Sequence, residues 1–138
     1  MAGRRARVRA MSDAPLRRAV AGSPATGAYS PGLLVQGTLL FVSGQGPLVD
    51  GEIRGGTIEE QTQLTLENLA AVLAAGGATP DDVVRCTVYL ADLADFAAMD
   101  AVFARFFGEP RPTRTTVGAQ LLDIGVEIDC IAVVGATP

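Results

Sequence analysis

The chain has 138 residues, 49% of them hydrophobic, a mean hydropathy of +0.31 and a net charge of −4. This length and composition fit one folded domain and exclude a disordered protein, and no apolar run approaches the roughly 20 residues that span a bilayer. The sequence contains no histidine, which excludes Ser-His-Asp and Cys-His catalysis and every histidine-ligated metal site.

The basic residues are unevenly distributed along the chain. All eleven are arginines, and Arg4, Arg5, Arg7 and Arg9 fall within the first ten residues. We therefore predict a disordered basic extension over residues 1–12 and a single domain over 13–138. Residues 11–138 hold seven arginines against fifteen acidic residues, a net charge of −8, which argues against a nucleic-acid-binding surface on the folded body.

Turn residues dominate the first part of the predicted domain. The prolines of residues 13–31 predict an irregular entry segment. Next, Leu33–Val35 and Leu39–Ser43 flank Gln36-Gly37-Thr38, a pattern that predicts two short strands around a tight turn.

The first long helix has a clear beginning and end in the sequence. Thr57–Glu60 has the pattern of a capping box, and Gly76-Gly77 is a stop signal. Apolar residues at helical spacing predict its buried stripe. They are Ile58, Leu64, Leu69, Val72 and Leu73.

The second half of the chain again predicts strands and a helix. Thr79–Asp82 predicts a helical turn that leads into a strand over Val83–Leu90, and Asp92 is the expected cap of a second helix. Two strands are predicted after it, around 114–118 and 125–134. The apolar stripe of the second helix, predicted to be core, consists of Phe96, Met99, Val102, Phe103 and Phe106.

The predicted order ββ-α-β-α-ββ indicates an α+β two-layer sandwich, with one mixed sheet covered on one face by two helices. The two β–α–β connections predict parallel neighbouring strands. The other face of the sheet would carry Arg85, Tyr89, Glu127 and Asp129 among apolar residues. This mixture predicts association with further copies of the chain.

Two charged residues stand out as chemical candidates. Arg114 follows a proline-rich segment and precedes an extended run, so its guanidinium is held near the start of a strand. A guanidinium matches a carboxylate with two parallel hydrogen bonds. Glu127 lies within an otherwise apolar strand. Together they indicate a site that binds a small carboxylic acid and acts on it chemically. The alternative is an ordinary Arg–carboxylate pair at a sheet edge.

Other motifs are open to two interpretations. The Ser43–Pro47 turn brings backbone close to a ligand or simply ends a strand. Tyr29 closes a pocket or packs on the entry segment, and Asp100 belongs to a site or to a solvated helix face. Cys86 and Cys130 lie in apolar runs without metal-ligand spacing, which predicts reduced core thiols in a cytoplasmic protein without a metal centre.

Ordered blocks between about Ser23 and Val134 make the chain resemble the reactive-intermediate deaminase family (RidA, YjgF or UK114 type, also labelled endoribonuclease L-PSP). The blocks are Gly27–Pro31, Leu40–Gln45, Glu59–Thr62, Leu66–Leu69, Asp81–Leu90, Asp95–Met99, Phe106–Pro110, Pro112–Val117 and Val126–Asp129.

The resemblance implies a chorismate-mutase-like fold, a homotrimer with sites between subunits, and hydrolysis of 2-enamine or 2-imino acids to 2-keto acids and ammonia without a cofactor. It also implies roles for individual residues: Arg114 binds the substrate carboxylate, and Glu127 positions or activates water. Ser43 and Gly44 line the pocket, and Tyr29 reaches it across the interface.

Two positions depart from the family pattern. Many members carry cysteine where this chain has Thr116 and asparagine where it has Asp100; both positions belong to the implied substrate pocket. These departures keep a second hypothesis open, a trimeric module that binds small carboxylates without turnover. A third, RNA cleavage or translation inhibition, fits poorly with the acidic body and the missing histidines.

Overall fold

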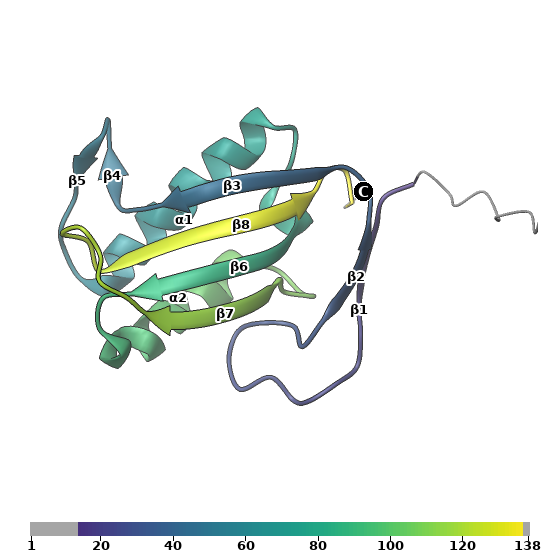
Figure 1. Cartoon of the computed structure of the whole chain (residues 1–138), viewed down its shortest axis with the longest axis horizontal. Coiled ribbons are helices and arrows are strands. Elements are labelled where there is room, and N and C mark those ends of the chain that lie inside the picture. Colours follow the sequence, from purple (N-terminus) through teal and green to yellow (C-terminus); the bar gives the residue numbers. More distant parts are fainter. Residues whose placement is uncertain (1–13, 137–138) are drawn as a thin grey trace, which may run out of the picture.

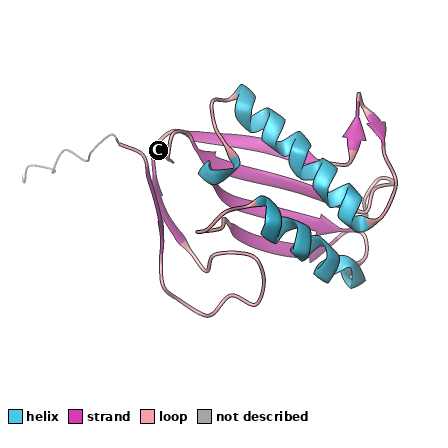
Figure 2. Cartoon of the chain, turned by 180° about the vertical axis from the view of Figure 1, so that it is seen from behind, coloured by secondary structure: helices cyan, strands magenta, loops and turns pink. Residues whose placement is uncertain are grey.

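A computed structural model describes residues 14–136; the predicted extension over residues 1–12 lies outside them. It has two layers, a mixed sheet and two helices that lie on one face of it (Figure 2), as predicted. No helix within the described residues is long and apolar enough to cross a membrane. In chain order the elements are β1 (Leu16–Ala19), β2 (Leu33–Gln36), β3 (Leu39–Gln45), β4 (Leu48–Val49), β5 (Glu52–Ile53), α1 (Ile58–Ala75), the 3-10 turn η1 (Pro80–Asp82), β6 (Val83–Leu90), the 3-10 turn η2 (Leu93–Asp95), α2 (Phe96–Phe106), β7 (Thr113–Gly118) and β8 (Val126–Val133).

The main sheet has the strand order β3-β8-β6-β7 (Figure 1). Strands β6 and β7, joined through α2, are parallel neighbours as predicted. The same expectation for β3 and β6, joined through α1, is wrong, because β8 lies between them and pairs antiparallel with both. In β8, Cys130 stands opposite Val42 on one side and Cys86 on the other. The last strand of the chain thus completes the centre of the sheet.

The predicted hairpin of β2 and β3 does not form. Instead β2 pairs with β1, a strand within the segment expected to be irregular, and Leu16 stands opposite Gln36. Gly37 has φ +140°, and a Cβ there would lie 2.7 Å from the Val133 side chain. Glycine is therefore required at this position, where the chain turns from β2 into β3 close to β8. Arg17 of β1 links the β1–β2 pair to the main sheet, because its guanidinium donates to the Val83 carbonyl at 3.0 and 2.8 Å.

Helix α1 begins and ends where the sequence predicts. The Thr57 hydroxyl accepts from the Glu60 amide at 3.2 Å, and Gly76 ends the helix. Its buried stripe differs from the prediction, since Val72 is 38% exposed and Leu64 is only partly buried. The Thr62 hydroxyl donates to the Ile58 carbonyl at 2.7 Å, which lets a polar residue join the buried row. That row is Thr62, Thr65, Leu66, Leu69 and Leu73.

Helix α2 carries the predicted core residues. Met99, Val102 and Phe103 are buried, and Phe96 and Phe106 pack against the core. The prediction that Asp92 caps this helix is wrong, because the Asp92 carboxylate accepts from the Ala94 amide at 2.9 Å and caps η2. The helix itself begins at Phe96, one short turn later.

The two cysteines are neighbours in the core. Cys86 and Cys130 are cross-strand partners, both buried and both free. Burial raises the pKa of Cys130 to about 12 and that of Cys86 well above its ordinary value. Since the thiolate is the reactive form, we expect thiol reagents at pH 8 to label the folded protein at least about a hundredfold more slowly than the unfolded chain. A colorimetric thiol assay with and without denaturant measures this, and rapid labelling of the folded protein would contradict the burial.

Figure 1 shows the face of the sheet that the helices leave uncovered. Apolar and charged residues share this face. Phe41 is 68% exposed and Leu39 is 48% exposed. On the same face, Glu127 stands opposite Tyr89, and the Tyr89 hydroxyl donates to the Asp129 carboxylate at 3.4 Å. The Asp129 charge raises the pKa of Tyr89.

Candidate functional site

Arg114 lies on the edge strand β7 with its side chain turned toward the helices. It stands opposite Cys86, and cross-strand partners share one face of a sheet. Its side chain is 1% exposed. Three aromatic rings surround the guanidinium, with centroids at 4.8 Å (Phe103), 5.2 Å (Tyr29) and 5.4 Å (Phe96) from its carbon. Ring faces favour a cation at such distances, which offsets part of the cost of burying the charge.

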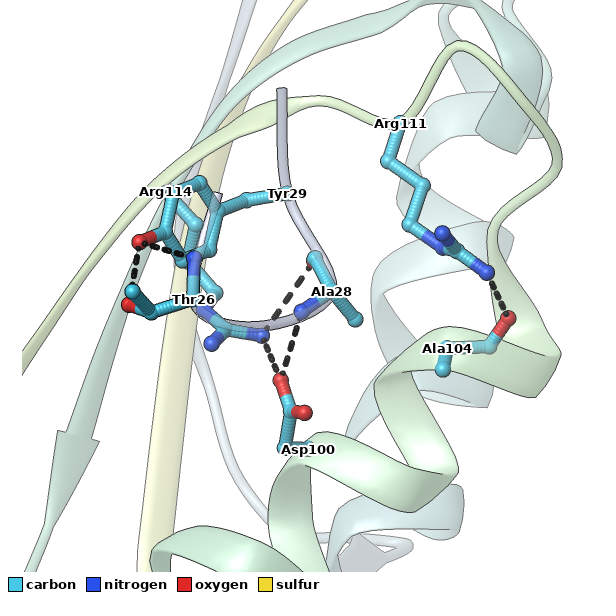
Figure 3. Close-up of polar contacts among 7 residues, drawn as sticks. All are labelled: Thr26, Ala28, Tyr29, Asp100, Ala104, Arg111 and Arg114. Carbon is cyan, nitrogen blue, oxygen red and sulfur yellow. Dashed lines mark hydrogen bonds and ion pairs between the residues drawn. The ribbon is translucent and has the colours of Figure 1, made fainter. Parts of the chain in front are cut away.

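Asp100 holds this guanidinium in place (Figure 3). Its Oδ1 accepts from Arg114 Nη1 at 2.7 Å and from the Ala28 amide at 2.9 Å. Arg114 Nη1 also donates to the Ala28 carbonyl at 3.3 Å. The entry segment, α2 and β7 therefore meet at one ion pair. The alternative interpretation of Arg114 is an ion pair with a carboxylate at a sheet edge. The Arg114–Asp100 pair on the edge strand β7 agrees with it.

The ion pair leaves polar atoms free. Arg114 Nη2 and Thr116 Oγ1 are buried and have no hydrogen-bond partner within residues 14–136. Both residues, with Thr26, Tyr29 and Phe96, line a cavity of about 210 Å³. An unpaired buried donor costs about 1–3 kcal/mol, so a native protein rarely leaves one without a purpose. A cationic N–H and a hydroxyl beside a small cavity suit one carboxylate group.

Tyr29 closes one side of this cavity. Its hydroxyl oxygen is 2.9 Å from Thr26 Oγ1 and accepts from the Thr26 amide at 3.2 Å. These hydrogen bonds lower the pKa of Tyr29 from its ordinary value. The ring lies beside Arg114 of its own chain, so this contact needs no neighbouring subunit. Gly27 makes the approach possible, because a Cβ there would lie 3.0 Å from Arg114 Nη2.

Glu127 belongs to a second group, on the open face of the sheet. The register between β3 and β8 shifts between Val42 and Gln45, and a Cβ on Gly44 would lie 2.8 Å from Glu127 Oε2. The bulge thus brings backbone directly beneath the carboxylate. Ser43 and Gly44 line a groove of about 370 Å³ that also includes Phe41 and Asp129.

The predicted site residues are therefore divided between two places. Tyr29, Asp100, Arg114 and Thr116 gather on the helix side at β7, whereas Ser43, Gly44 and Glu127 gather on the open side at β3 and β8. Within one chain, Arg114 and Glu127 lie on opposite faces of the sheet. Within the described residues no three Cys, Asp or Glu side chains come together as metal ligands.

Sequence reasoning missed the aromatic surroundings of Arg114. The sequence predicts Phe96 and Phe103 as core residues, and they do pack there, yet both rings also lie against the guanidinium. A signal was present, since Phe96, Asp100 and Phe103 follow i, i+4, i+7 spacing and share one face of α2. The Ala28 amide and carbonyl also bind Asp100 and Arg114. Residue types could not predict these contacts, because they are made by backbone atoms.

Comparisons with known proteins agree on one family. A family model described as "Endoribonuclease L-PSP" matches residues 20–134. "Reactive Intermediate Deaminase A, chloroplastic" of Arabidopsis thaliana is 38% identical over 112 residues, which are 78% of this chain and 59% of that protein. A Rid-family protein of unknown function, YyfB from Yersinia pestis, has a TM-score of 0.76 and 30% identity over 86% of this chain and 98% of that one. E. coli TdcF, crystallised with bound serine, has a TM-score of 0.65 and 34% identity over 84% and 91%.

Proposed function

The chain belongs to the RidA/YjgF family, whose family model is described as endoribonuclease L-PSP, and on this premise we propose that it hydrolyses reactive 2-enamine or 2-imino acids. The products are a 2-keto acid and ammonia, and we propose substrates of the 2-iminobutanoate and 2-iminopropanoate type, whose small size suits a cavity of about 210 Å³. The observation that carries the proposal is the unpaired Arg114 Nη2 beside Thr116 Oγ1 in a small cavity. The serine bound to the related TdcF is a small α-carboxylate of similar size.

The reaction asks little of the protein. One water adds across the C=N bond, the carbon keeps the water oxygen as a carbonyl, and the nitrogen leaves as ammonia with the transferred protons. Arg114 and Thr116 would fix the carboxylate, and Glu127 would take a proton from water and return it to the nitrogen. Orientation and general acid–base help are sufficient for this step, so no cofactor is proposed.

Arg114 and Glu127 can act on one substrate only if different subunits supply them. We therefore propose a homotrimer in which the open sheet face of one chain brings Glu127 to the Arg114 cavity of the next. The exposed Phe41 and Leu39 on that face support burial in an assembly. Assembly in the cytoplasm, without nucleic acid or membrane as a partner, remains a prediction from the sequence.

The proposal is tested by generating imines in situ with an amino-acid oxidase and measuring 2-keto acid and ammonia release. The wild-type protein should accelerate release above the spontaneous rate for at least one small amino acid. Carboxylate binding without acceleration would instead support the non-catalytic binding module. Incubating the same preparation with RNA tests the activity named in the family label, and we expect no cleavage.

Gly44 provides a test of the open-face group. Gly44→Ala places a Cβ 2.8 Å from Glu127 Oε2, which is too close, so the carboxylate must move. We expect turnover to fall about tenfold or more while carboxylate affinity at Arg114 stays unchanged, because misplaced acid–base groups lose much of their effect. Gly55→Ala is the control, since a Cβ there meets nothing within 4 Å. An equal loss in both variants would contradict a specific role for Gly44.

A further inference from the structure

The arginine of the cavity is already neutralised by a carboxylate of its own chain. Asp100 Oδ1 lies 2.7 Å from Arg114 Nη1, and the Asp100 side chain is 24% exposed while that of Arg114 is 1% exposed. The hydrogen bonds that Asp100 accepts from the Ala28 amide and from Arg114 Nη1 both go to Oδ1. A ligand that reaches Arg114 Nη2 therefore binds a guanidinium whose other terminal nitrogen is already paired with a carboxylate.

We propose that Asp100 makes this site selective for ligands that carry a positive charge next to their carboxylate, such as protonated 2-imino acids and 2-amino acids, over 2-keto acids that carry the carboxylate alone. The inference rests on the proposed function and names the charge pattern of its substrate. Asp100 acts here as a specificity-determining residue and takes no part in bond making or breaking.

Electrostatics supports this assignment. A lone anion gains its contact with Arg114 Nη2 but is repelled by Asp100, which is attached to the same guanidinium. A zwitterion gains the same contact, and the attraction of its positive group to Asp100 offsets the repulsion of that group by Arg114. The aromatic rings of Tyr29, Phe96 and Phe103 exclude water around the guanidinium, so these charges interact more strongly than they would in solvent.

This charge pattern also predicts that the substrate binds more tightly than the product. The protonated imine matches the site, whereas hydrolysis removes the positive group and leaves a 2-keto acid that the Asp100 carboxylate repels. Product therefore leaves more readily than substrate. The class of reaction that supplies such a ligand is one that converts an amino acid into its imine, because that step keeps the carboxylate and nitrogen adjacent.

The experiment measures binding by calorimetry with two stable probes of equal length, alanine for the zwitterion and pyruvate for the anion. It uses the wild-type protein, Asp100→Asn and Glu67→Gln. Asparagine keeps an oxygen that can accept from Arg114 Nη1 and the Ala28 amide, so the geometry is retained while the charge is lost. Glu67→Gln removes the same charge from an exposed position on α1, hydrogen-bonded to Gln63 at 3.1 Å.

We expect wild type to bind alanine more tightly than pyruvate. Asp100→Asn should raise pyruvate affinity about tenfold and leave alanine affinity unchanged or weaker, and Glu67→Gln should change neither. Equal changes for both probes, or none, would overturn the proposal by reducing Asp100 to a structural role. If Asp100→Asn fails to fold, a wild-type preference for pyruvate overturns it and a preference for alanine supports it. Selective binding without imine hydrolysis would refute the proposed function alone.

Discussion

Arg114→Ala is expected to abolish carboxylate binding and to lower imine hydrolysis at least about a hundredfold. The substitution removes the cationic donor that lines the cavity, and charge-assisted hydrogen bonds to a carboxylate contribute most of the fixation of so small a ligand. Binding of pyruvate and alanine by calorimetry and release of 2-keto acid from oxidase-generated imines are the measurements. Arg105→Ala on α2 is the matched control, because Arg105 is exposed and does not line the cavity.

The same variant should also lose stability. Asp100 would retain only the Ala28 amide as a hydrogen-bond donor, and the three rings would surround an empty space. We expect a loss of about 2 kcal/mol in the free energy of unfolding, measured by denaturant titration. Arg114→Lys separates stability from binding, since one ammonium cannot serve Asp100 and a ligand with the geometry of a guanidinium fork. It should restore most stability and little binding; unchanged affinity in Arg114→Ala would exclude Arg114 as the anion site.

Local patterns in the sequence are sufficient to predict the elements of the fold. The capping box at Thr57, the glycine stop at Gly76 and the alternation of Val83–Leu90 each have a local physical cause, and the structure has a helix or strand boundary at each place. Strand order has no such local signal. The position of β8 between β3 and β6 depends on which apolar faces fit together over the helices, as Cys130 does between Val42 and Cys86.

The arrangement of the candidate site also depends on contacts between elements, which local sequence patterns do not predict. Residue type alone singled out Arg114 and Glu127 as chemically unusual in their surroundings. It could not show that they lie on opposite faces of the sheet, because that follows from the register of β6 with both β7 and β8. Nor could it show that Asp100, which sits among apolar neighbours on α2, turns toward Arg114, since this contact joins residues from two separate elements.

Glu127→Gln is expected to keep carboxylate affinity and to lower turnover about a hundredfold or more. The amide retains the size and hydrogen-bonding reach of the side chain beside Gly44 but cannot exchange a proton with water, and general acid–base help contributes about 10²–10⁴ to such reactions. Turnover from oxidase-generated imines and pyruvate affinity are measured on the same preparation. Glu59→Gln is the matched control, because Glu59 is exposed in the first turn of α1 and belongs to neither group of site residues. A wild-type rate in Glu127→Gln would remove this carboxylate from the mechanism.

Mixing the two inactive variants tests whether one site is shared between chains. If Arg114 comes from one subunit and Glu127 from the next, subunits of Arg114→Ala and Glu127→Gln that are unfolded and refolded together in equal amounts rebuild intact sites. Random assembly gives both wild-type residues at about one quarter of the sites, so activity should recover to about a quarter of the wild-type value. Sites built within a single chain would show no recovery, because each chain would still lack one of the two residues. The opposite faces occupied by Arg114 and Glu127 in the sheet favour recovery.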